Sequence, residues 1–169
     1  MSDPALPSWL PPMAEVNPWR ETTYDELYAI FRRDFLMTRL SYLGFNVWFY
    51  PDTDDNGKKL IFWHLTSRED KSTNPPTRLP DLRRSERLPW IRPSILRCPC
   101  PSGDILHWDH EEGDGAIKTY IWLHVLDFLI VLKRLPDGRR RLITSYHLDS
   151  EHQRDKTRKK HERRMQKAK

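Results

Sequence analysis

YIWLHVLDFLIVLKRLPDGRRRLITSYH, residues 120–147, is the stretch that decides the predicted fold. Its two apolar runs, Tyr120–His124 and Phe128–Lys133, are rich in the β-branched and aromatic residues that favour strands. Pro136-Asp137-Gly138 has the composition of a tight turn, so we expect Arg141–His147 to return as a third strand. The stretch therefore predicts neighbouring strands joined by short turns.

The sequence before this stretch predicts one long helix and two more strands. Apolar residues recur at helical spacing across Tyr24–Leu40. Phe45–Tyr50 has the composition of a strand, and Asn56-Gly57 accepts the positive φ angles of a hairpin turn. We expect Lys59–Leu65 to form the returning strand, with His64 near its far end.

The middle of the chain is interrupted by prolines. Asp81–Leu88 is predicted to form a short helix, and Pro89 and Pro93 are expected to hold the residues between them extended. Ser94–Cys98 is then expected to form a strand, and residues 99–115 a long surface loop. The connections are short enough for antiparallel pairing of about four to six strands.

These elements predict an α+β fold, in which a twisted antiparallel sheet is preceded by a helix and followed by a basic C-terminal helix. Residues 1–20 are Pro-rich and are expected to form a flexible arm outside the core. Residues 21–150 would form a single domain, and residues 151–169 the basic helix, capped by Asp149 or Ser150. No apolar run approaches the roughly 20 residues that span a bilayer, and the first residues lack a secretion-signal pattern. We therefore expect a cytoplasmic protein.

The positive charge is concentrated in two segments. Residues 151–169 contain nine Lys or Arg and three acidic residues, and residues 78–97 contain six Arg and two acidic residues. Two basic segments suit a polyanionic partner such as RNA, and neither has the apolar face that membrane binding requires. For the C-terminal segment alone, an ordinary solvated helix is an equally good interpretation.

Motifs for cofactors are missing from the sequence. It contains no Gly-rich phosphate loop and no motif of zinc peptidases or serine hydrolases. The string from Cys98 to His110 is the one candidate for zinc, but its C-x-C spacing differs from that of structural zinc sites. We expect no metal and no nucleotide cofactor.

The remaining candidate chemistry is cleavage of RNA, which needs a base for the 2′-hydroxyl, an acid for the departing 5′-oxygen and fixed cations around the phosphorane. His64 titrates near neutral pH and can be the base or the acid, while Thr144 and Tyr146 can bond to the phosphate. Arginines bind phosphate in planar forks, and tryptophans stack on bases. The residues expected to bind RNA are Arg68, Arg78, Arg83, Arg87, Trp90 and Lys160. The alternative for His64 is a packed histidine at a sheet edge.

Several short motifs occur in a defined order. They are FWHLTSRE (62–69), RLPDLRRSERLPWIRPSI (78–95), the YIWL, DFLIVL and LITSY runs within residues 120–146, and then the basic helix. In this order they resemble the phage-associated nucleases of the barnase, EndoU, colicin and RelE-like superfamily (the BECR fold), over roughly residues 59–164. The Pro-rich start and the 99–115 segment have no counterpart to which a role can be assigned.

The resemblance implies an antiparallel sheet with preceding helices, a metal-independent ribonuclease that acts as a toxin, and a cognate inhibitor protein. It also implies that His64 is the catalytic histidine and that Arg92 binds phosphate, with Thr144 and Tyr146 as the polar residues of the last strand. The first hypothesis is therefore an endoribonuclease that leaves a 2′,3′-cyclic phosphate on tRNA, rRNA or mRNA. The alternatives are a non-catalytic RNA-binding module and a phage accessory protein that binds an acidic protein partner.

Overall fold

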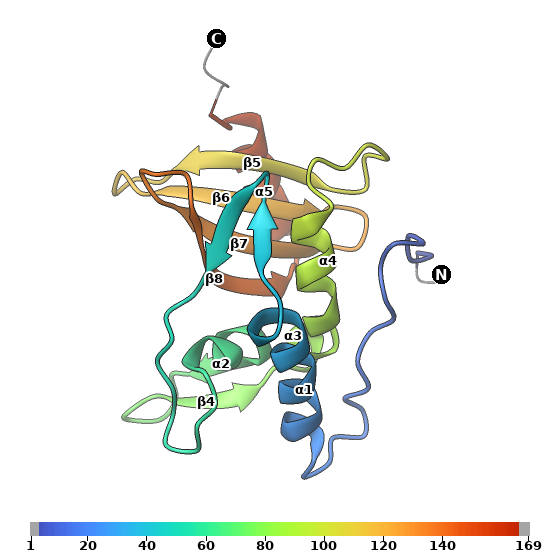
Figure 1. Ribbon diagram of the computed structural model, residues 1–169, viewed down its shortest axis with the longest axis vertical. Helices are drawn as coiled ribbons and strands as arrows, with labels where there is room; N and C mark the ends of the chain where they lie inside the picture. The colour runs from blue at the N-terminus through green and yellow to red at the C-terminus, as the bar shows by residue number, and fades with distance from the viewer. Residues whose placement is uncertain (1–3, 166–169) are drawn as a thin grey trace.

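The computed structural model describes residues 4–165 and shows an α+β architecture built on one large sheet (Figure 1). The strands of that sheet are β1 (Leu40–Tyr42), β2 (Phe45–Trp48), β5 (Leu106–Glu111), β6 (Ile117–Leu123), β7 (Phe128–Arg134) and β8 (Arg140–His147). A separate hairpin consists of β3 (Ser67–Asp70) and β4 (Thr77–Pro80). The helical segments are α1 (Thr23–Phe31), the π-helical turn η1 (Arg32–Leu36), α2 (Leu60–Thr66), α3 (Leu82–Glu86), the 3-10 turn η2 (Leu88–Trp90), α4 (Ile91–Leu96) and α5 (Glu151–Glu162). The predicted α+β class is confirmed.

The large sheet is mixed, in the order β1-β2-β8-β7-β6-β5. β5 to β8 form an antiparallel meander, as the 120–147 stretch predicts for its three strands. β2, however, pairs with β8 in parallel, through Val47 with Arg140 and Trp48 with Arg141. The prediction of a wholly antiparallel sheet is therefore wrong at this pairing. These two strands are far apart in the sequence, so no tight turn fixes their relative direction.

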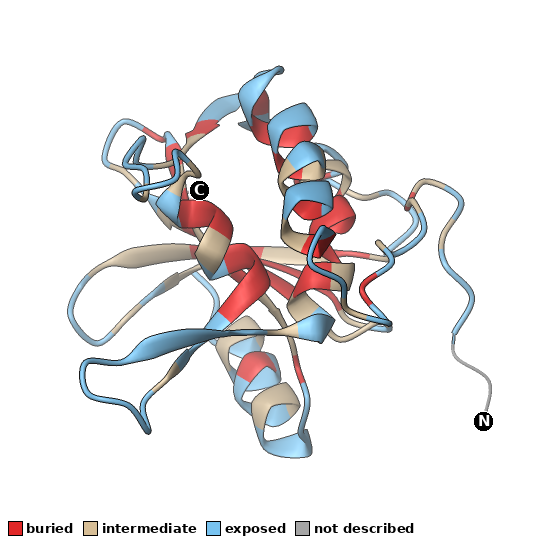
Figure 2. Cartoon of the chain, turned by 90° about the horizontal axis from the view of Figure 1, so that it is seen from below, coloured by how far each residue is buried: buried red, intermediate tan, exposed pale blue. Residues whose placement is uncertain are grey.

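The two faces of the sheet are covered differently. On one side, which we call the helical face, α1, α2 and α4 contribute Phe31, Phe62 and Ile95 to the larger apolar cluster. The other side, the α5 face, carries Trp108 and Leu129 in a smaller cluster beneath α5. In Figure 2 the helices on the helical face carry several buried residues (red), whereas α5 on the other side is mostly exposed or intermediate.

The predicted strand Lys59–Leu65 is instead the helix α2. Ile61, Phe62 and Leu65 are buried and are spaced as one face of a helix, although the same apolar run also fits a strand. This face packs into the cluster of the helical face. His64 lies outside this apolar face and is exposed to solvent.

Four further predictions are wrong in whole or in part. Pro89 and Pro93 do not hold the chain extended, because they lie in the first turns of η2 and α4, where a helix needs no N–H from them. The predicted strand Ser94–Cys98 is for the same reason largely part of α4. The predicted loop at residues 99–115 contains β5, whose polar residues at the edge of the sheet conceal its strand character. The predicted helix over residues 24–40 ends earlier, with η1 at Leu36.

The N-terminal segment is packed against the domain. Leu10 and Val16 are buried in the cluster of the helical face, and the indole N–H of Trp9 donates to Asp104 (3.0 Å). The expectation that this segment stays outside the core is therefore wrong for these residues, while residues 1–3 of the predicted arm lie outside the described chain. Ser150 caps the N-terminus of α5, as predicted. The helix ends at Glu162, before residue 169 where the prediction placed its end, and residues 166–169 lie outside the described chain. Within residues 4–165, none of the helices has the length and apolar character needed to cross a membrane.

Candidate functional site

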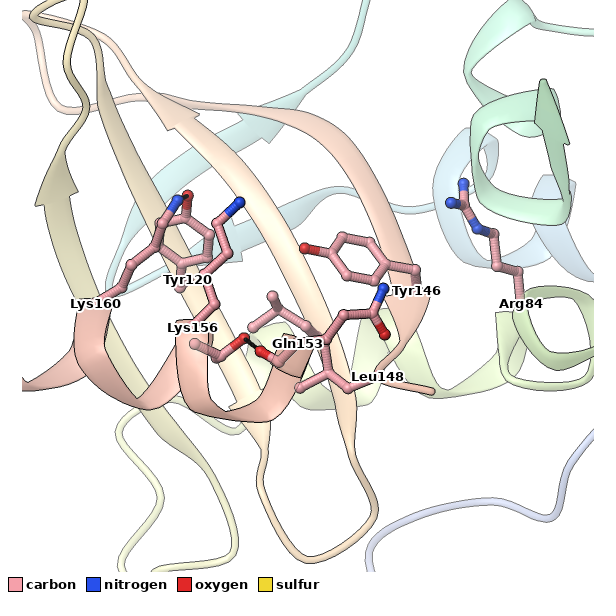
Figure 3. A pocket seen from close by; sticks show the side chains of 9 residues that line it. Arg84, Tyr120, Tyr146, Leu148, Gln153, Lys156 and Lys160 are labelled. Atoms are coloured by element: carbon pink, nitrogen blue, oxygen red, sulfur yellow. Dashed lines mark hydrogen bonds between the residues drawn. The ribbon is translucent and has the colours of Figure 1, made fainter. Parts of the chain in front are cut away.

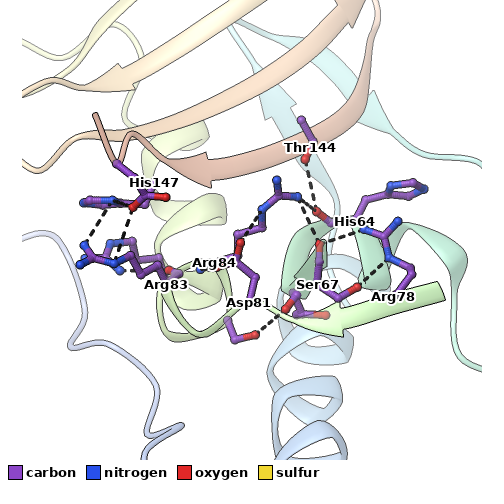
Figure 4. Close-up of polar contacts among 12 residues, drawn as sticks. His64, Ser67, Arg78, Asp81, Arg83, Arg84, Thr144 and His147 are labelled. Atoms are coloured by element: carbon purple, nitrogen blue, oxygen red, sulfur yellow. Dashed lines mark hydrogen bonds and ion pairs between the residues drawn. The ribbon is translucent and has the colours of Figure 1, made fainter. Parts of the chain in front are cut away.

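The C-terminal end of α2 is held by side chains from three other elements (Figure 4). Arg78 of β4 donates to the carbonyl of Ser67 (2.9 Å). Arg84 of α3 and Thr144 of β8 donate to the carbonyl of His64, at 3.1 Å and 3.2 Å. These bonds satisfy carbonyls that a helix end leaves without intrahelical partners, and they place positive charge at the negative end of the helix dipole.

His64 borders a cavity of about 470 Å³ between α2 and β8, which we call the His64 pocket. Its lining residues are Tyr50, Asp52, Leu60, Ile61, His64, Arg141, Leu142, Ile143 and Thr144. The guanidinium of Arg141 lies 4.4 Å from the centroid of the Tyr50 ring. The structure thus brings two predicted residues, His64 and Thr144, into one pocket that also has a cation.

Positive charge surrounds the imidazole of His64. Partial burial, together with the charges of Arg78 and Arg84, lowers the pKa of His64 below its ordinary value. The neutral form of the ring therefore dominates at neutral pH. Because a neutral imidazole accepts protons, the pocket combines a base with one lining cation, Arg141, and one lining carboxylate, Asp52.

Tyr146 faces a different cavity, of about 310 Å³, between the sheet and α5 (Figure 3). We call it the α5 pocket, and its lining residues are Arg84, Tyr120, Leu129, Tyr146, Leu148, Gln153, Lys156, Thr157 and Lys160. The guanidinium of Arg84 lies 5.7 Å from the centroid of the Tyr146 ring. The predicted residues Tyr146 and Lys160 are therefore together in the α5 pocket, and Arg84 lies between the two pockets.

A charged network holds one wall of the α5 pocket. Nζ of Lys160 bonds to Oε1 of Glu112 (3.1 Å) and to the hydroxyl of Tyr120 (2.8 Å), and that hydroxyl donates to Glu112. Burial raises the pKa of Tyr120 and of Tyr146, and Glu112 raises that of Tyr120 further. Both hydroxyl groups therefore stay protonated at neutral pH and can donate hydrogen bonds.

Three of the predicted site residues make structural contacts inside the protein and line neither pocket. Arg92 donates to the backbone carbonyls of Asp34 and Arg39, each at 3.0 Å, and so ties α4 to the segment around η1. Trp90 is 2% exposed and Arg87 beside it is 9% exposed, with the guanidinium 5.3 Å from the indole ring. The structure therefore does not bring Arg87, Trp90 or Arg92 together with His64.

The other predicted arginines are exposed but differ in position. Arg78 bonds to the end of α2, beside His64. Arg83 lies near the end of β8, where its guanidinium is 3.6 Å from Asp149. Arg68 is exposed on β3. Arg78 is the one of these three whose charge is among the causes of the lowered pKa of His64.

Arg141 and Lys156 were not predicted as site residues, and Arg84 was predicted only as part of the basic segment 78–97. Arg84 follows Asp81 by three residues on the short helix α3, and this spacing is the signal that pairs them, at 3.3 Å. Lys156 precedes Lys160 by four residues, which places both on one face of α5. No local pattern distinguishes Arg141 from the arginines beside it.

A scan against protein-family models and searches among curated proteins and solved structures gave no match. Among residues 4–165, no three His, Cys, Asp or Glu side chains form a group that could hold a metal ion. Cys98 and Cys100 are free thiols, and burial raises the pKa of Cys98 to about 12. The candidate site is therefore defined by its own geometry and charge.

Proposed function

We propose that the protein is an endoribonuclease that cleaves RNA at the His64 pocket. The observation that carries the proposal is the lowered pKa of an accessible imidazole in a pocket that Arg141 lines and that Arg78 and Arg84 influence. This arrangement provides a base and fixed cations at one place. Both are required for attack of a 2′-hydroxyl on the neighbouring phosphate.

In the proposed reaction, Nδ1 or Nε2 of His64 accepts the proton of the 2′-hydroxyl. The 2′-oxygen forms a bond to phosphorus, the bond to the 5′-oxygen breaks, and that oxygen takes up a proton from water, to which the His64 imidazolium returns its own. The products are a 2′,3′-cyclic phosphate and a 5′-hydroxyl end. The guanidiniums stabilise the negative charge of the phosphorane, so that this role does not require a metal ion.

The resemblance to the BECR-fold nucleases supports the same proposal. It implies His64 as the catalytic histidine; the resemblance expects it on a strand, whereas here it lies at the end of α2, where its backbone carbonyl accepts a hydrogen bond from Thr144 of β8. Its implied phosphate ligand, Arg92, bonds to backbone carbonyls near η1 and does not line the His64 pocket, so Arg141, which lines it, takes that role in the proposal. From the same resemblance we propose a toxin-like action on tRNA, rRNA or mRNA in the cytoplasm, and a cognate inhibitor protein.

RNA binding without cleavage is the second candidate function. Tyr146, which was expected to bond to the phosphate together with Thr144, lines the α5 pocket and not the His64 pocket. On this alternative, the same cations hold RNA phosphates and the affinity falls steeply with salt concentration. A phage accessory protein that binds an acidic protein partner would have no such salt-dependent affinity for RNA.

The test is a gel assay of total RNA in excess EDTA with the wild type, His64→Ala and His152→Ala. His152 is exposed on α5 and is the matched control. We expect cleavage with cyclic-phosphate ends by the wild type and by His152→Ala, and at least about 100-fold slower cleavage by His64→Ala. Equal cleavage by all three proteins would remove His64 from the mechanism. Salt-dependent binding without cleavage by any of them would favour the second function.

A further inference from the structure

The α5 pocket is a second cavity that the proposed cleavage at His64 does not use. Figure 3 shows the hydroxyl of Tyr146, the amide of Gln153 and the ammonium of Lys156 turned toward one space between the sheet and α5. These side chains come from β8 and from successive turns of α5. The volume of about 310 Å³ is at the lower end of the range for small-molecule sites, roughly 300–1,000 Å³.

The charge of this pocket favours an anion. Of the described residues that line it, three are cations and none is acidic. Two of the cations form ion pairs: Lys160 lies 3.1 Å from Glu112, and Arg84 lies 3.3 Å from Asp81. Three positive charges against two negative charges leave one in excess, and Lys156, exposed at the rim, provides it.

The polar groups in the pocket are hydrogen-bond donors. The oxygen of the Gln153 amide accepts from the backbone N–H of Asp149 (2.7 Å), which leaves its NH₂ group to face the cavity. The hydroxyl of Tyr146 stays protonated because burial raises its pKa. A phosphate group, with several acceptor oxygens and a negative charge, matches such a set of donors.

The floor of the pocket is apolar. Leu129 and Leu148 are each 1% exposed and form the buried base of the pocket, and the half-buried ring of Tyr146 next to them offers accessible apolar surface. A free phosphate ion would leave this ring unused, whereas the base of a nucleotide can stack on it. The pocket therefore matches a phosphate that is joined to a nucleoside.

We infer that the α5 pocket binds one nucleotide of an RNA strand, with its phosphate at Lys156 and the hydroxyl of Tyr146, and its base against the ring of Tyr146. This inference rests on the proposed function, because the nucleotide is the neighbour of the one cleaved at His64. Thr144 lines the His64 pocket and Tyr146 lines the α5 pocket, two residues further along β8 and therefore about 7 Å away. Adjacent nucleotides of an extended strand can reach both.

The experiment is an NMR titration of the full chain with adenosine 3′-monophosphate and, separately, with inorganic phosphate. The proteins are the wild type, His64→Ala, Lys156→Gln, Tyr146→Phe and Lys159→Gln. Lys159 is exposed on α5 and does not line the pocket, so it is the matched control for the loss of one charge. Thermal unfolding of each variant verifies that it is folded.

We expect the wild type and His64→Ala to bind the nucleotide equally, and at least about 10-fold more tightly than inorganic phosphate. Lys156→Gln should weaken nucleotide binding about 10-fold, as loss of a charged hydrogen bond predicts, and Tyr146→Phe about 3-fold. Lys159→Gln should stay within about twofold of the wild type.

Equal weakening by Lys156→Gln and Lys159→Gln would overturn the inference, since it would show only non-specific attraction to a basic helix. Inorganic phosphate that binds as tightly as the nucleotide would overturn it as well. The RNA cleavage assay separates the two proposals. Pocket-dependent nucleotide binding without cleavage refutes the nuclease alone, and cleavage without pocket-dependent binding refutes the α5 pocket alone.

Discussion

The helical face and the α5 face of the sheet are stabilised by different interactions. On the helical face, Phe31, Phe62 and Leu65 are completely buried, and the rings of Phe31 and Phe62 lie 5.7 Å apart. Apolar area removed from water is the main stabilising contribution of such a cluster. This face therefore holds the larger part of the core.

α5 is attached to the opposite face mainly by polar contacts. Thr157 is its one buried residue. Arg154 pairs with Asp127 (3.2 Å) and Lys160 with Glu112 (3.1 Å), and these ion pairs join the helix to the sheet. Partly exposed ion pairs contribute little to stability, typically about 0–1 kcal/mol each.

A helix that buries one residue cannot fill the space above the sheet, and the α5 pocket is the space that remains. The contrast between the faces teaches that stability and the proposed nucleotide site depend on opposite sides of the sheet. Substitutions on the helical face should therefore affect folding most, and substitutions on the α5 face should affect binding at a smaller cost to folding.

The largest expected effect comes from the same substitution made on each face. Leu65→Ala removes a side chain enclosed on the helical face and should lower the free energy of unfolding by about 4 kcal/mol. Leu129→Ala should cost about 2 kcal/mol, because Leu129 borders the α5 pocket and its loss enlarges a cavity that already opens to solvent. Urea unfolding measures both values. Equal losses would break the contrast between the faces.

A smaller effect is expected at the ion pair that holds α5. Burial works to raise the pKa of Glu112, but hydrogen bonds from Tyr120 and Lys160 lower it below its ordinary value. A lowered carboxyl pKa stabilises the folded state above the unfolded pKa, and this stabilisation is lost as the pH falls through the folded pKa. Glu112→Gln should therefore cost about 1 kcal/mol at pH 7 and reduce the loss of stability below about pH 4.5.

The control for this prediction is Asp155→Asn, which removes the exposed pair with Arg158 on the same helix. It should change the free energy of unfolding by less than about 0.5 kcal/mol. Urea unfolding at pH 7 and pH 4, for the wild type and both variants, measures the difference. If Glu112→Gln retained the full pH dependence of the wild type, Glu112 would not be the group that stabilises the α5 face.

The fold was predictable where local pattern alone decides it. The strands β6 and β7 are apolar on both sides, and the turn at Gly138, with φ +93°, is encoded by the residues around it. The helix α2 was not predictable in this way, because its seven residues fit a strand equally well and the packing partners of Phe62, which are Tyr28 and Phe31, lie far from it in the sequence. The parallel pairing of β2 with β8 has no local signal at all.

The candidate site was predictable only in part, because burial decides which arginines remain available. His64 and Thr144 were expected in one site, and the structure places them in contact across 80 positions of sequence. Arg92 and Arg84 look alike in the sequence, yet Arg92 bonds to carbonyls near η1 while Arg84 lies between the two pockets. Tyr146 is only two residues beyond Thr144, but it lines a different cavity.

The smallest expected effect is a shift in the pKa of His64 at the end of α2. Here the charge of a neighbouring side chain, and not the apolar area that it buries, is the property on which the proposed function depends. Arg78→Gln removes a positive charge beside His64, so the protonated imidazole becomes easier to form and the pKa of His64 should rise toward its ordinary value. Arg78→Lys keeps the charge and should leave the pKa low. NMR titration of the ring protons measures this without any substrate, and the acid limb of the cleavage rate should move to higher pH by the same amount if His64 is the base. A pKa that rises equally in both variants would assign the effect to altered burial, and the arginine would then act on His64 through packing alone.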